Sequence, residues 1–464
     1  TEGPGHGGNV TITAQNLQLD QSFINTGNFF ANEFGVDATG SAGNVNISTD
    51  SLNLYFTQIV TDAFSFPNRT GQSGDITVTA HDISLDISQF SSQAYKQGGA
   101  ITITTDHLLA TDSQVIATTN LLPGGGVTIT GMGIELMTGS SVVSSTGGDG
   151  DAGSIHITAT DHLGLLRASA SDRPSGIFSN SFGSFGSAGN AGDIVINTPK
   201  LEMTGGSRIN TTTATSGHGG NVTINATDLI SMSGETGSFA PEPLFSLGGI
   251  QPSGIFTRTI GGKCSGPCGD AGNISITTGS LTLNTGGQIN SGTSTSGHGG
   301  EITIHATDTI SLSGTLSDGT PVGILSRTIG TAPDSGAGGN ISLTAGQSVT
   351  ISDGASVSAS STGPGPTGNI QINAGNQLAM TNSSVTTEAN QASGGLIKIT
   401  TDPNGTVQLT NSTISASVLD GAGGGGSVNI DPQYVILLNS QILANAVQGP
   451  GGNISITTNF LLPD

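Results

Sequence analysis

The chain repeats one short pattern in which aliphatic and polar residues alternate after a glycine. The first copy is Gly8-Asn9-Val10-Thr11-Ile12-Thr13, and the same arrangement occurs fifteen times in all before the end of the sequence. Alternation with a period of two is typical of a β-strand that has one buried and one exposed face. The opening glycines are Gly8, Gly43, Gly74, Gly99, Gly125, Gly153, Gly192, Gly220, Gly272, Gly300, Gly339, Gly368, Gly395, Gly426 and Gly452.

Each repeat contains two further apolar segments. The first copy continues with Leu17 and Leu19 and then with Ser22 and Ile24, and the other copies follow the same order. Three short strands per repeat cannot bury their aliphatic side chains alone, but stacked repeats can. We therefore predict an all-β fold, a right-handed parallel β-helix (solenoid) of about 15 rungs at the strand spacing of a sheet. It is expected to form a single domain over 1–464, as a fragment of a longer chain.

The opening glycines and the residues after them are the predicted structural positions. We expect the glycines to hold a backbone conformation with positive φ, which glycine tolerates best. Asparagine follows in several copies, and stacked amides are expected to form a hydrogen-bonded ladder between rungs. The predicted turn glycines are Gly8, Gly43, Gly220, Gly272, Gly300, Gly339 and Gly452, and the predicted asparagine ladder is Asn9, Asn44, Asn221, Asn273, Asn340, Asn369 and Asn453.

A longer duplication lies in the middle of the chain. The segments 216–220 and 296–300 share the sequence Ser-Gly-His-Gly-Gly. The later segments 254–261 and 323–330 are also near copies, Gly-Ile-Phe-Thr-Arg-Thr-Ile-Gly and Gly-Ile-Leu-Ser-Arg-Thr-Ile-Gly. Long and short repeats alternate here, which predicts loop insertions near 168–190, 235–270 and 315–337 on one side of the solenoid. These loops are rich in Pro, Phe and Arg and carry both cysteines, so we expect them to make the contacts.

Charge and composition narrow the range of functions. The formal net charge is −22, with only ten Lys and Arg residues in the chain, which argues against a nucleic-acid partner. The apolar runs are short, so no segment is expected to span a membrane. The first residues lack a signal-peptide pattern, and the last ones stop partway through a repeat. End-to-end self-association into fibres is a possible outcome of open terminal rungs.

Few residues suggest site chemistry. His6, His218 and His298 share one position of the repeat, and exposed turn histidines are favoured over metal ligands because their rungs are too far apart to share an ion. Cys264 and Cys268 are close enough in sequence for a disulfide, with free thiols or a metal site as alternatives. The segment 147–151, Gly-Gly-Asp-Gly-Asp, is favoured as a plain turn over a calcium site. No catalytic residue, metal or cofactor is predicted.

Ice binding and polysaccharide cleavage are the two alternative function classes. Outward Thr-x-Thr pairs such as Thr11/Thr13 and Thr102/Thr104 are similar to those of ice-binding β-helices, but threonine is also favoured on any exposed strand. A polysaccharide-active β-helix enzyme would need carboxylates and cations gathered on one face, and the six Arg and four Lys residues are spread along the chain. A protein without enzymatic activity is therefore favoured.

The repeats resemble a known family. Segments 336–345, 438–446 and 451–456 look like the repeats of filamentous-haemagglutinin-like large exoproteins of the two-partner secretion type. The resemblance covers nearly the whole chain. It implies a secreted protein at the bacterial cell surface or outside the cell, an outer-membrane two-partner secretion transporter as export partner, and a role as an adhesin or fibre component that contacts host, cell or glycan surfaces. The amino-terminal secretion domain of that family is not found in this sequence.

Overall fold

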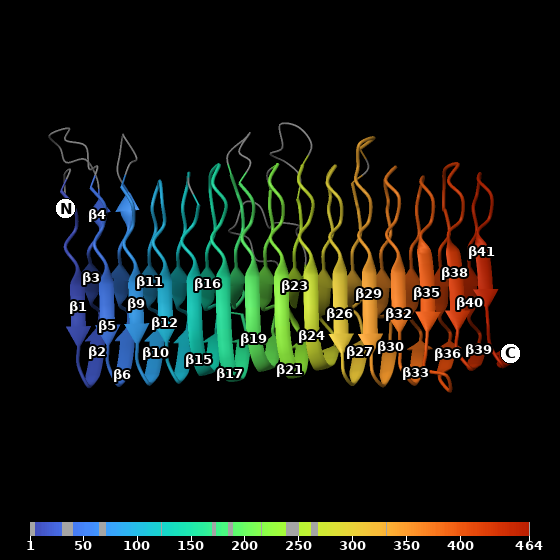
Figure 1. Cartoon of the computed structure of the whole chain (residues 1–464), viewed down its shortest axis with the longest axis horizontal. Helices are drawn as coiled ribbons and strands as arrows, with labels where there is room; N and C mark the ends of the chain where they lie inside the picture. The colour runs from blue at the N-terminus through green and yellow to red at the C-terminus, as the bar shows by residue number, and fades with distance from the viewer. Residues whose placement is uncertain are drawn as a thin grey trace. The chain divides into compact units, whose positions relative to one another are not determined.

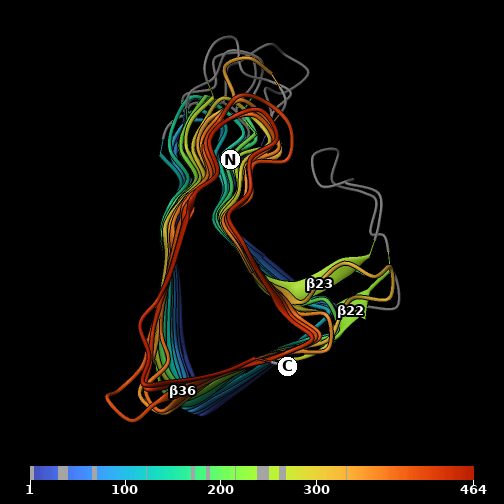
Figure 2. The same cartoon turned by 90° about the vertical axis from the view of Figure 1, so that its right-hand side faces the viewer.

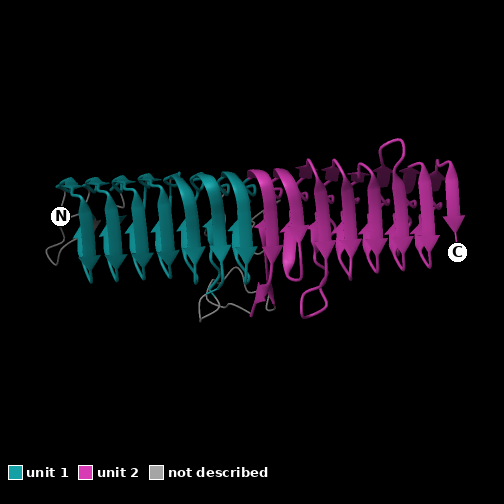
Figure 3. Ribbon diagram, turned by 90° about the horizontal axis from the view of Figure 1, so that it is seen from below, with its two compact units in different colours: residues 1–220, 239–246, 262–265 teal, residues 221–238, 247–261, 266–464 magenta. Residues whose placement is uncertain are grey.

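In the computed structural model, all regular structure within the described residues is β-structure (Figure 1). The structure describes residues 5–29, 40–64, 71–121, 123–168, 173–183, 189–214, 216–237, 250–260, 268–330 and 332–463. The chain divides into two compact units, coloured separately in Figure 3. Unit 1 comprises residues 1–220, 239–246 and 262–265, and unit 2 comprises residues 221–238, 247–261 and 266–464. Each unit is described by itself.

Unit 1 is a stack of rungs with three strand faces. The first face contains β1 (Val10–Thr13), β5 (Val45–Ser48), β9 (Ile76–Thr79) and β12 (Ile101–Thr104). The second face contains β2 (Asn16–Asp20), β6 (Ser51–Tyr55), β10 (Asp82–Asp86) and β13 (His107–Thr111). Three longer strands continue from the first face onto the second, namely β15 (Val127–Met137), β17 (Ile155–Leu166) and β19 (Ile194–Thr204). The third face contains β3 (Phe23–Asn25), β7 (Gln58–Val60), β11 (Gln89–Ser91), β14 (Gln114–Ile116), β16 (Ser141–Val143), β18 (Gly176–Phe178) and β20 (Arg208–Asn210), and β4 (Asn28–Phe29) pairs with β8 (Ala63–Phe64) beyond it.

Unit 2 repeats this arrangement. Its long strands are β21 (Val222–Ser233) and β24 (Ile274–Leu283). The first face continues with β26 (Ile302–Ala306), β29 (Ile341–Ala345), β32 (Ile370–Asn373), β35 (Leu396–Thr400), β38 (Ser427–Asp431) and β41 (Asn453–Ile456). The second face contains β27 (Thr309–Ser313), β30 (Ser348–Ser352), β33 (Gln377–Thr381), β36 (Thr406–Thr410), β39 (Tyr434–Leu438) and β42 (Phe460–Pro463). The third face contains β23 (Gln251–Phe256), β25 (Gly287–Asn290), β28 (Gly323–Leu325), β31 (Ser356–Ser358), β34 (Ser384–Thr386), β37 (Thr413–Ser415) and β40 (Gln441–Leu443), and β22 (Glu235–Thr236) pairs with β23 in antiparallel orientation.

The strands on each face are parallel and in register, which confirms the predicted parallel β-helix. Val45 lies opposite Ile76, and Ile302 lies opposite Ile341, so equivalent aliphatic side chains stack from rung to rung. The stacked aliphatics are almost completely buried and form the core of each unit. Seen end-on in Figure 2, the three strands of a rung enclose this core as the sides of a triangle, and the chain then passes through a narrower head.

The opening glycines are required for a reason other than the predicted one. None of them is among the described residues with positive φ. Instead, a Cβ atom at Gly43 would overlap the carbonyl oxygen of Gly8, and a Cβ at Gly300 would overlap that of Gly272. Consecutive rungs approach so closely at this corner that only a residue without a side chain fits. The expectation of positive φ was therefore wrong, and close backbone packing explains the column of glycines.

Positive φ occurs at a different corner, between the second and third strands. Asp112 has φ 45° and Ile87 has φ 48°, and other rungs place asparagine or glycine at or beside the equivalent position. This left-handed conformation is rare for residues with side chains and is costly for a β-branched residue. A hydroxyl residue follows at this corner in many rungs and compensates through hydrogen bonds. Among the described residues, the non-glycine positions with positive φ are Gln21, Phe56, Ile87, Asp112, Thr138, Arg167, Asp353, Asn382, Asn411 and Asn439.

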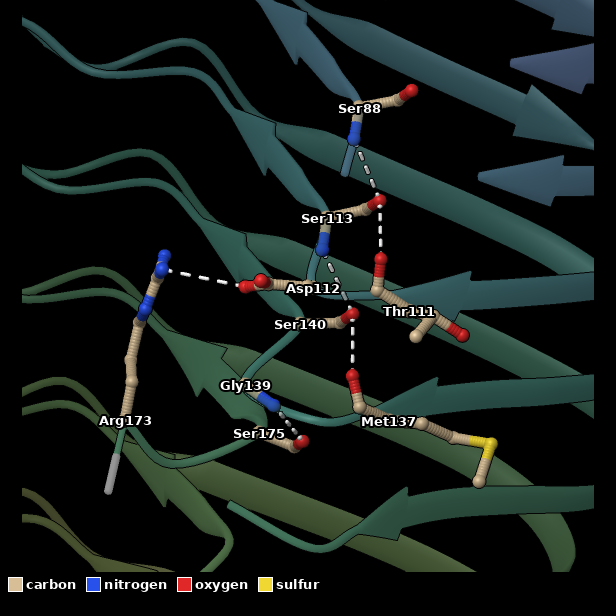
Figure 4. Close-up of polar contacts among 9 residues, drawn as sticks. All are labelled: Ser88, Thr111, Asp112, Ser113, Met137, Gly139, Ser140, Arg173 and Ser175. Atoms are coloured by element: carbon tan, nitrogen blue, oxygen red, sulfur yellow. Dashed lines mark hydrogen bonds and ion pairs between the residues drawn. The ribbon is translucent and has the colours of Figure 1, made fainter. Parts of the chain in front are cut away.

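Figure 4 shows the hydroxyl ladder that follows this corner in unit 1. The backbone N–H of Ser88 donates to Ser113 Oγ at 2.9 Å, and the N–H of Ser113 donates to Ser140 Oγ at 3.0 Å. The Ser113 hydroxyl in turn donates to the carbonyl oxygen of Thr111 at 2.8 Å, and the Ser140 hydroxyl donates to that of Met137 at 2.7 Å. Each hydroxyl therefore joins two rungs and satisfies backbone groups that the turn would leave unpaired.

The three predicted loop regions also contain ladder strands. The segment 168–190 includes β18, the segment 235–270 includes β22 and β23, and the segment 315–337 includes β28. The prediction assigned these stretches to loops because long and short repeats alternate in this part of the chain. In the structure, Ile177, Ile255 and Ile324 fill the inward position of the third strand. The insertions are therefore shorter than predicted and flank the third face.

Candidate functional site

The residues of the predicted asparagine ladder do join neighbouring rungs, but most of their hydrogen bonds reach the backbone and not a second amide. Asn9 Oδ1 accepts the backbone N–H of Asn44 at 2.8 Å, and Asn221 Oδ1 accepts that of Asn273 at 2.9 Å. Amide-to-amide bonding occurs between Asn369 Nδ2 and Asn340 Oδ1 at 3.2 Å. The backbone N–H is a fixed donor that strand pairing leaves unpaired at this turn, so it is the preferred partner of the side chain on the preceding rung. These residues therefore act within the framework.

Of the two cysteines in the predicted disulfide, one is among the described residues. Cys264 lies outside the described residues, so the Cys264–Cys268 bond remains a prediction. Cys268 is described, and its backbone N–H donates to Ser296 Oγ at 2.8 Å. This contact ties the end of the insertion to the next rung.

The three histidines that share a repeat position belong to turns between rungs. His6 Nδ1 accepts the backbone N–H of Ser41 at 3.1 Å, and His298 Nδ1 accepts that of Ala337 at 2.9 Å. The backbone N–H of His218 donates to Asn190 Oδ1 at 2.7 Å. Within the described part of the chain, no three His, Cys, Asp or Glu side chains gather in a way that would hold a metal ion.

In unit 2, two insertions meet in a corner lobe, defined here by β22, the first residues of β23 and the turn 315–321. Thr315 pairs with Pro321 in antiparallel fashion, so this turn forms a small extension of the rung. The backbone N–H of Ser317 donates to the Glu235 carboxylate at 3.1 Å, across 82 residues of sequence. Figure 2 shows β22 and β23 at the corner of the triangular section. The long rungs therefore build one shared structure.

The last residue row of the third face in unit 2 and the row two residues beyond it form a depression that we call the arginine notch. Thr293 pairs with Thr259 on one side and with Thr328 on the other. This register places Gly292 between Arg258 and Arg327. In the row two residues earlier, Asn290 lies between Phe256 and Leu325. The middle rung thus has small or polar residues where its neighbours have large ones, which leaves a cavity of about 90 Å³ lined by both arginines, Asn290 and Gly292.

The notch concentrates positive charge that has no acidic partner among the described residues. Among the residues that the structure describes, no carboxylate lies within ion-pair distance of Arg258 or Arg327. The Arg258 guanidinium lies over the Phe256 ring at 4.7 Å from its centroid, and its Nε is enclosed without a hydrogen-bond partner. Burial lowers the pKa of Arg258 to about 10 and also lowers the pKa of Arg327. Both side chains remain cationic at neutral pH.

This pairing is hidden in the sequence because the arginines are spread along the chain. The signal was present in the two copies of Gly-Ile-(Phe/Leu)-(Thr/Ser)-Arg-Thr-Ile-Gly, at 254–261 and 323–330. Long and short repeats alternate there, so the copies occupy every second rung, and a side chain in one copy faces its equivalent across a single intervening rung. Register, rather than distance along the chain, brings them together.

Unit 1 has a related arrangement on its second face, which we call the histidine groove. Gly133 pairs with His107 on one side and with His162 on the other. The groove has a volume of about 350 Å³. Here His162 has acidic partners: its Nδ1 lies 2.9 Å from Asp161 Oδ2, and its Nε2 lies 3.3 Å from Glu135 Oε1. The hydrogen bond with Asp161, followed by that with Glu135, raises the pKa of His162.

No family model, curated protein or solved structure matches the chain. Within the described residues, no helix is long and apolar enough to cross a membrane. The arginine notch and the corner lobe stand out by their own geometry. They form the candidate functional site because they combine inserted segments with unpaired, partly enclosed charge.

Proposed function

We propose that the chain is a secreted bacterial structural or adhesive protein, a β-helical scaffold or fibre component that presents inserted segments for contact. The observation that carries this proposal is the corner lobe, in which Glu235 and the turn 315–321 are joined across rungs of an otherwise regular framework. Some rungs carry extra residues at one corner while the buried framework stays regular. This arrangement favours a scaffold that makes its contacts through surface segments.

The resemblance to filamentous-haemagglutinin-like exoproteins supports the same proposal. It adds export through an outer-membrane two-partner secretion transporter and a location at the cell surface or outside the cell. Fractionation of the producing cells with an antibody to the chain tests the location. The protein is expected in the outer-membrane and medium fractions, and recovery in the cytosol alone would contradict the proposal.

Surface attachment tests the role of the corner lobe. The double variant S317R/D318R changes two exposed residues at the tip of the lobe, and E301R/T303R changes two exposed residues of the first face of unit 2. Both add bulk and positive charge without altering the buried framework. Purified wild-type protein is expected to attach to bacterial or host-cell layers, and only the lobe variant should lose attachment. Equal attachment by all three proteins would reject the lobe as the contact region.

Ice binding and polysaccharide cleavage remain the alternatives, and neither is favoured by a specific observation. Thermal hysteresis of the purified protein would support ice binding, and release of reducing ends from a polysaccharide would support an enzyme.

A further inference from the structure

We propose that the arginine notch of unit 2 is a binding site for one small oxyanion, a carboxylate or sulfate group, held between Arg258 and Arg327. The inference deepens the proposed adhesive function, since it gives the chemistry of one contact. Anion binding is nevertheless measured on the purified chain and does not require attachment to any surface.

The two arginines of the notch have no acidic partner among the described residues. A guanidinium that is withdrawn from water is normally paired with an acid or saturated with hydrogen bonds, because desolvation of an isolated ion is costly. Arg258 has an enclosed Nε with no partner, and within the described chain no carboxylate pairs with Arg258 or Arg327. The missing component of this arrangement is an anion.

The spacing of the two arginines suits one anion held between them. The backbones of Arg258 and Arg327 lie two rungs apart, about 10 Å at the strand spacing of a sheet. A residue with a side chain would not fit at position 292 in the row between them, because a Cβ there would lie 2.5 Å from the carbonyl oxygen of Arg327. Guanidinium groups bind carboxylate and sulfate oxygens through paired N–H donors, and two of them on opposite sides of one anion match its oxygens.

The size of the cavity limits what the notch can hold. The cavity of about 90 Å³ is small, on the scale of a single carboxylate or sulfate group. A whole sugar ring or a nucleotide would not fit within it. The rest of the ligand would therefore lie outside the notch, against Ile260 and the exposed Ile329.

The charge around the notch favours an isolated acidic group over a polymer with dense charge. The chain has a formal net charge of −22, so a long polyanion is repelled by most of its surface. In the row that contains the two arginines, Ser360 follows Arg327 and Glu388 comes next, which limits the positive region to the notch. At physiological salt, charges beyond about 8 Å are largely screened.

Titration calorimetry and ¹H–¹⁵N NMR of the purified chain test the site at constant ionic strength. The probes are sodium sulfate, sodium glucuronate and, as a neutral control, glucose. Sulfate and glucuronate are expected to bind with one site per chain and to shift the arginine Nε–H signals, whereas glucose should not bind. Equal affinities would identify a site for free small oxyanions, and tighter glucuronate binding would identify an acidic sugar as the source. The absence of binding by both anions would overturn the proposal.

Variants separate the notch from general charge effects. The substitution Arg327→Ala is expected to weaken anion binding by about tenfold or more, the effect of losing one charged hydrogen-bonding partner. Lys398→Ala removes an equal charge from an exposed strand position of the same unit and should leave affinity within about twofold. Equal effects of the two variants would overturn the proposal.

A further variant supplies the anion from within the chain. Asn290→Asp places a carboxylate in the notch, so the melting temperature should rise and binding of added sulfate or glucuronate should disappear. A variant that melts lower and still binds the probes would contradict the site. If anion binding is established while S317R/D318R attaches normally to surfaces, the oxyanion site stands and the adhesive role of the lobe fails. The two proposals therefore fail separately.

Discussion

Two glycines in equivalent settings show how the same framework can hold either a closed or an open set of charges. Gly133 of unit 1 lies between His107 and His162, and Gly292 of unit 2 lies between Arg258 and Arg327. In the histidine groove, His162 is matched by carboxylates on its own and the preceding rung. In the arginine notch, the described chain supplies no such match.

The difference teaches how to separate structural polarity from binding chemistry on a repetitive surface. Paired exposed groups contribute little to stability and need no ligand to explain them. Unpaired cations that are partly withdrawn from water reduce stability, so their presence calls for a function. The two regions can be compared directly because both arise from in-register stacking on either side of a glycine.

The largest expected loss of stability comes from a charge placed in the core of the rung that contains Gly292. Ile276 is buried between Ile224 and Ile304, so Ile276→Asp would place an unpaired charge among aliphatic side chains. We expect a loss of several kcal/mol, a large fraction of a typical stability of about 5–15 kcal/mol. Thermal unfolding followed by circular dichroism measures it. Thr277→Asp, on the exposed side of the same strand, is the control, and equal melting temperatures for the two variants would contradict the core assignment.

The next effect comes from adding a methyl group at each of the two glycines. Gly292→Ala meets the backbone of Arg327, which cannot move without disturbing the ladder, and should cost about 1–3 kcal/mol. Gly133→Ala meets the rings of His162 and His107, at 2.9 and 3.2 Å from the added atom. Side chains can rotate away, so we expect a loss below about 1 kcal/mol. Chemical denaturation measures both, and a larger loss for Gly133→Ala would reverse the comparison.

Replacing an arginine by methionine in each unit sharpens the comparison further. Arg258→Met removes an enclosed, unpaired charge and keeps an apolar side chain over Phe256, so the chain should gain about 1–3 kcal/mol of stability. Arg173 is partly exposed and pairs with Asp112 at 3.3 Å, as Figure 4 shows, so Arg173→Met should change stability by less than about 1 kcal/mol. A clear loss of stability in the Arg258 variant would show that this charge is compensated.

The smallest effect is a pH dependence in the histidine groove. The pKa of His162 is raised above its ordinary value of 6.5, chiefly by the hydrogen bond with Asp161. A raised folded-state pKa stabilises the chain below the unfolded pKa, and this contribution is lost as pH rises through the folded pKa. The melting temperature should therefore fall slightly as pH rises above about 6.5. His162→Gln should remove this component and the control His156→Gln should not; a retained slope in His162→Gln would assign it to other groups.

The sequence predicted the strands well because each inward position is set by alternation, and alternation is visible in one dimension. Ile47, Leu52 and Ile59 all occupy the buried positions that their patterns indicate. The conformation of the opening glycines was predicted wrongly, since their need for space depends on a neighbouring rung. The arginine notch escaped detection for the same reason. Contacts between rungs depend on which repeats are long and which are short, and that register is fixed by packing.

The hydroxyl ladder shown in Figure 4 also has a consequence for mechanical load. Its bonds run from rung to rung, so tension applied to a chain end is borne by one interface between rungs before the next. Within a unit, pulling should therefore peel rungs away one at a time and leave those behind them intact. Such a material yields in small steps and dissipates work at each one, which suits a protein exposed to shear.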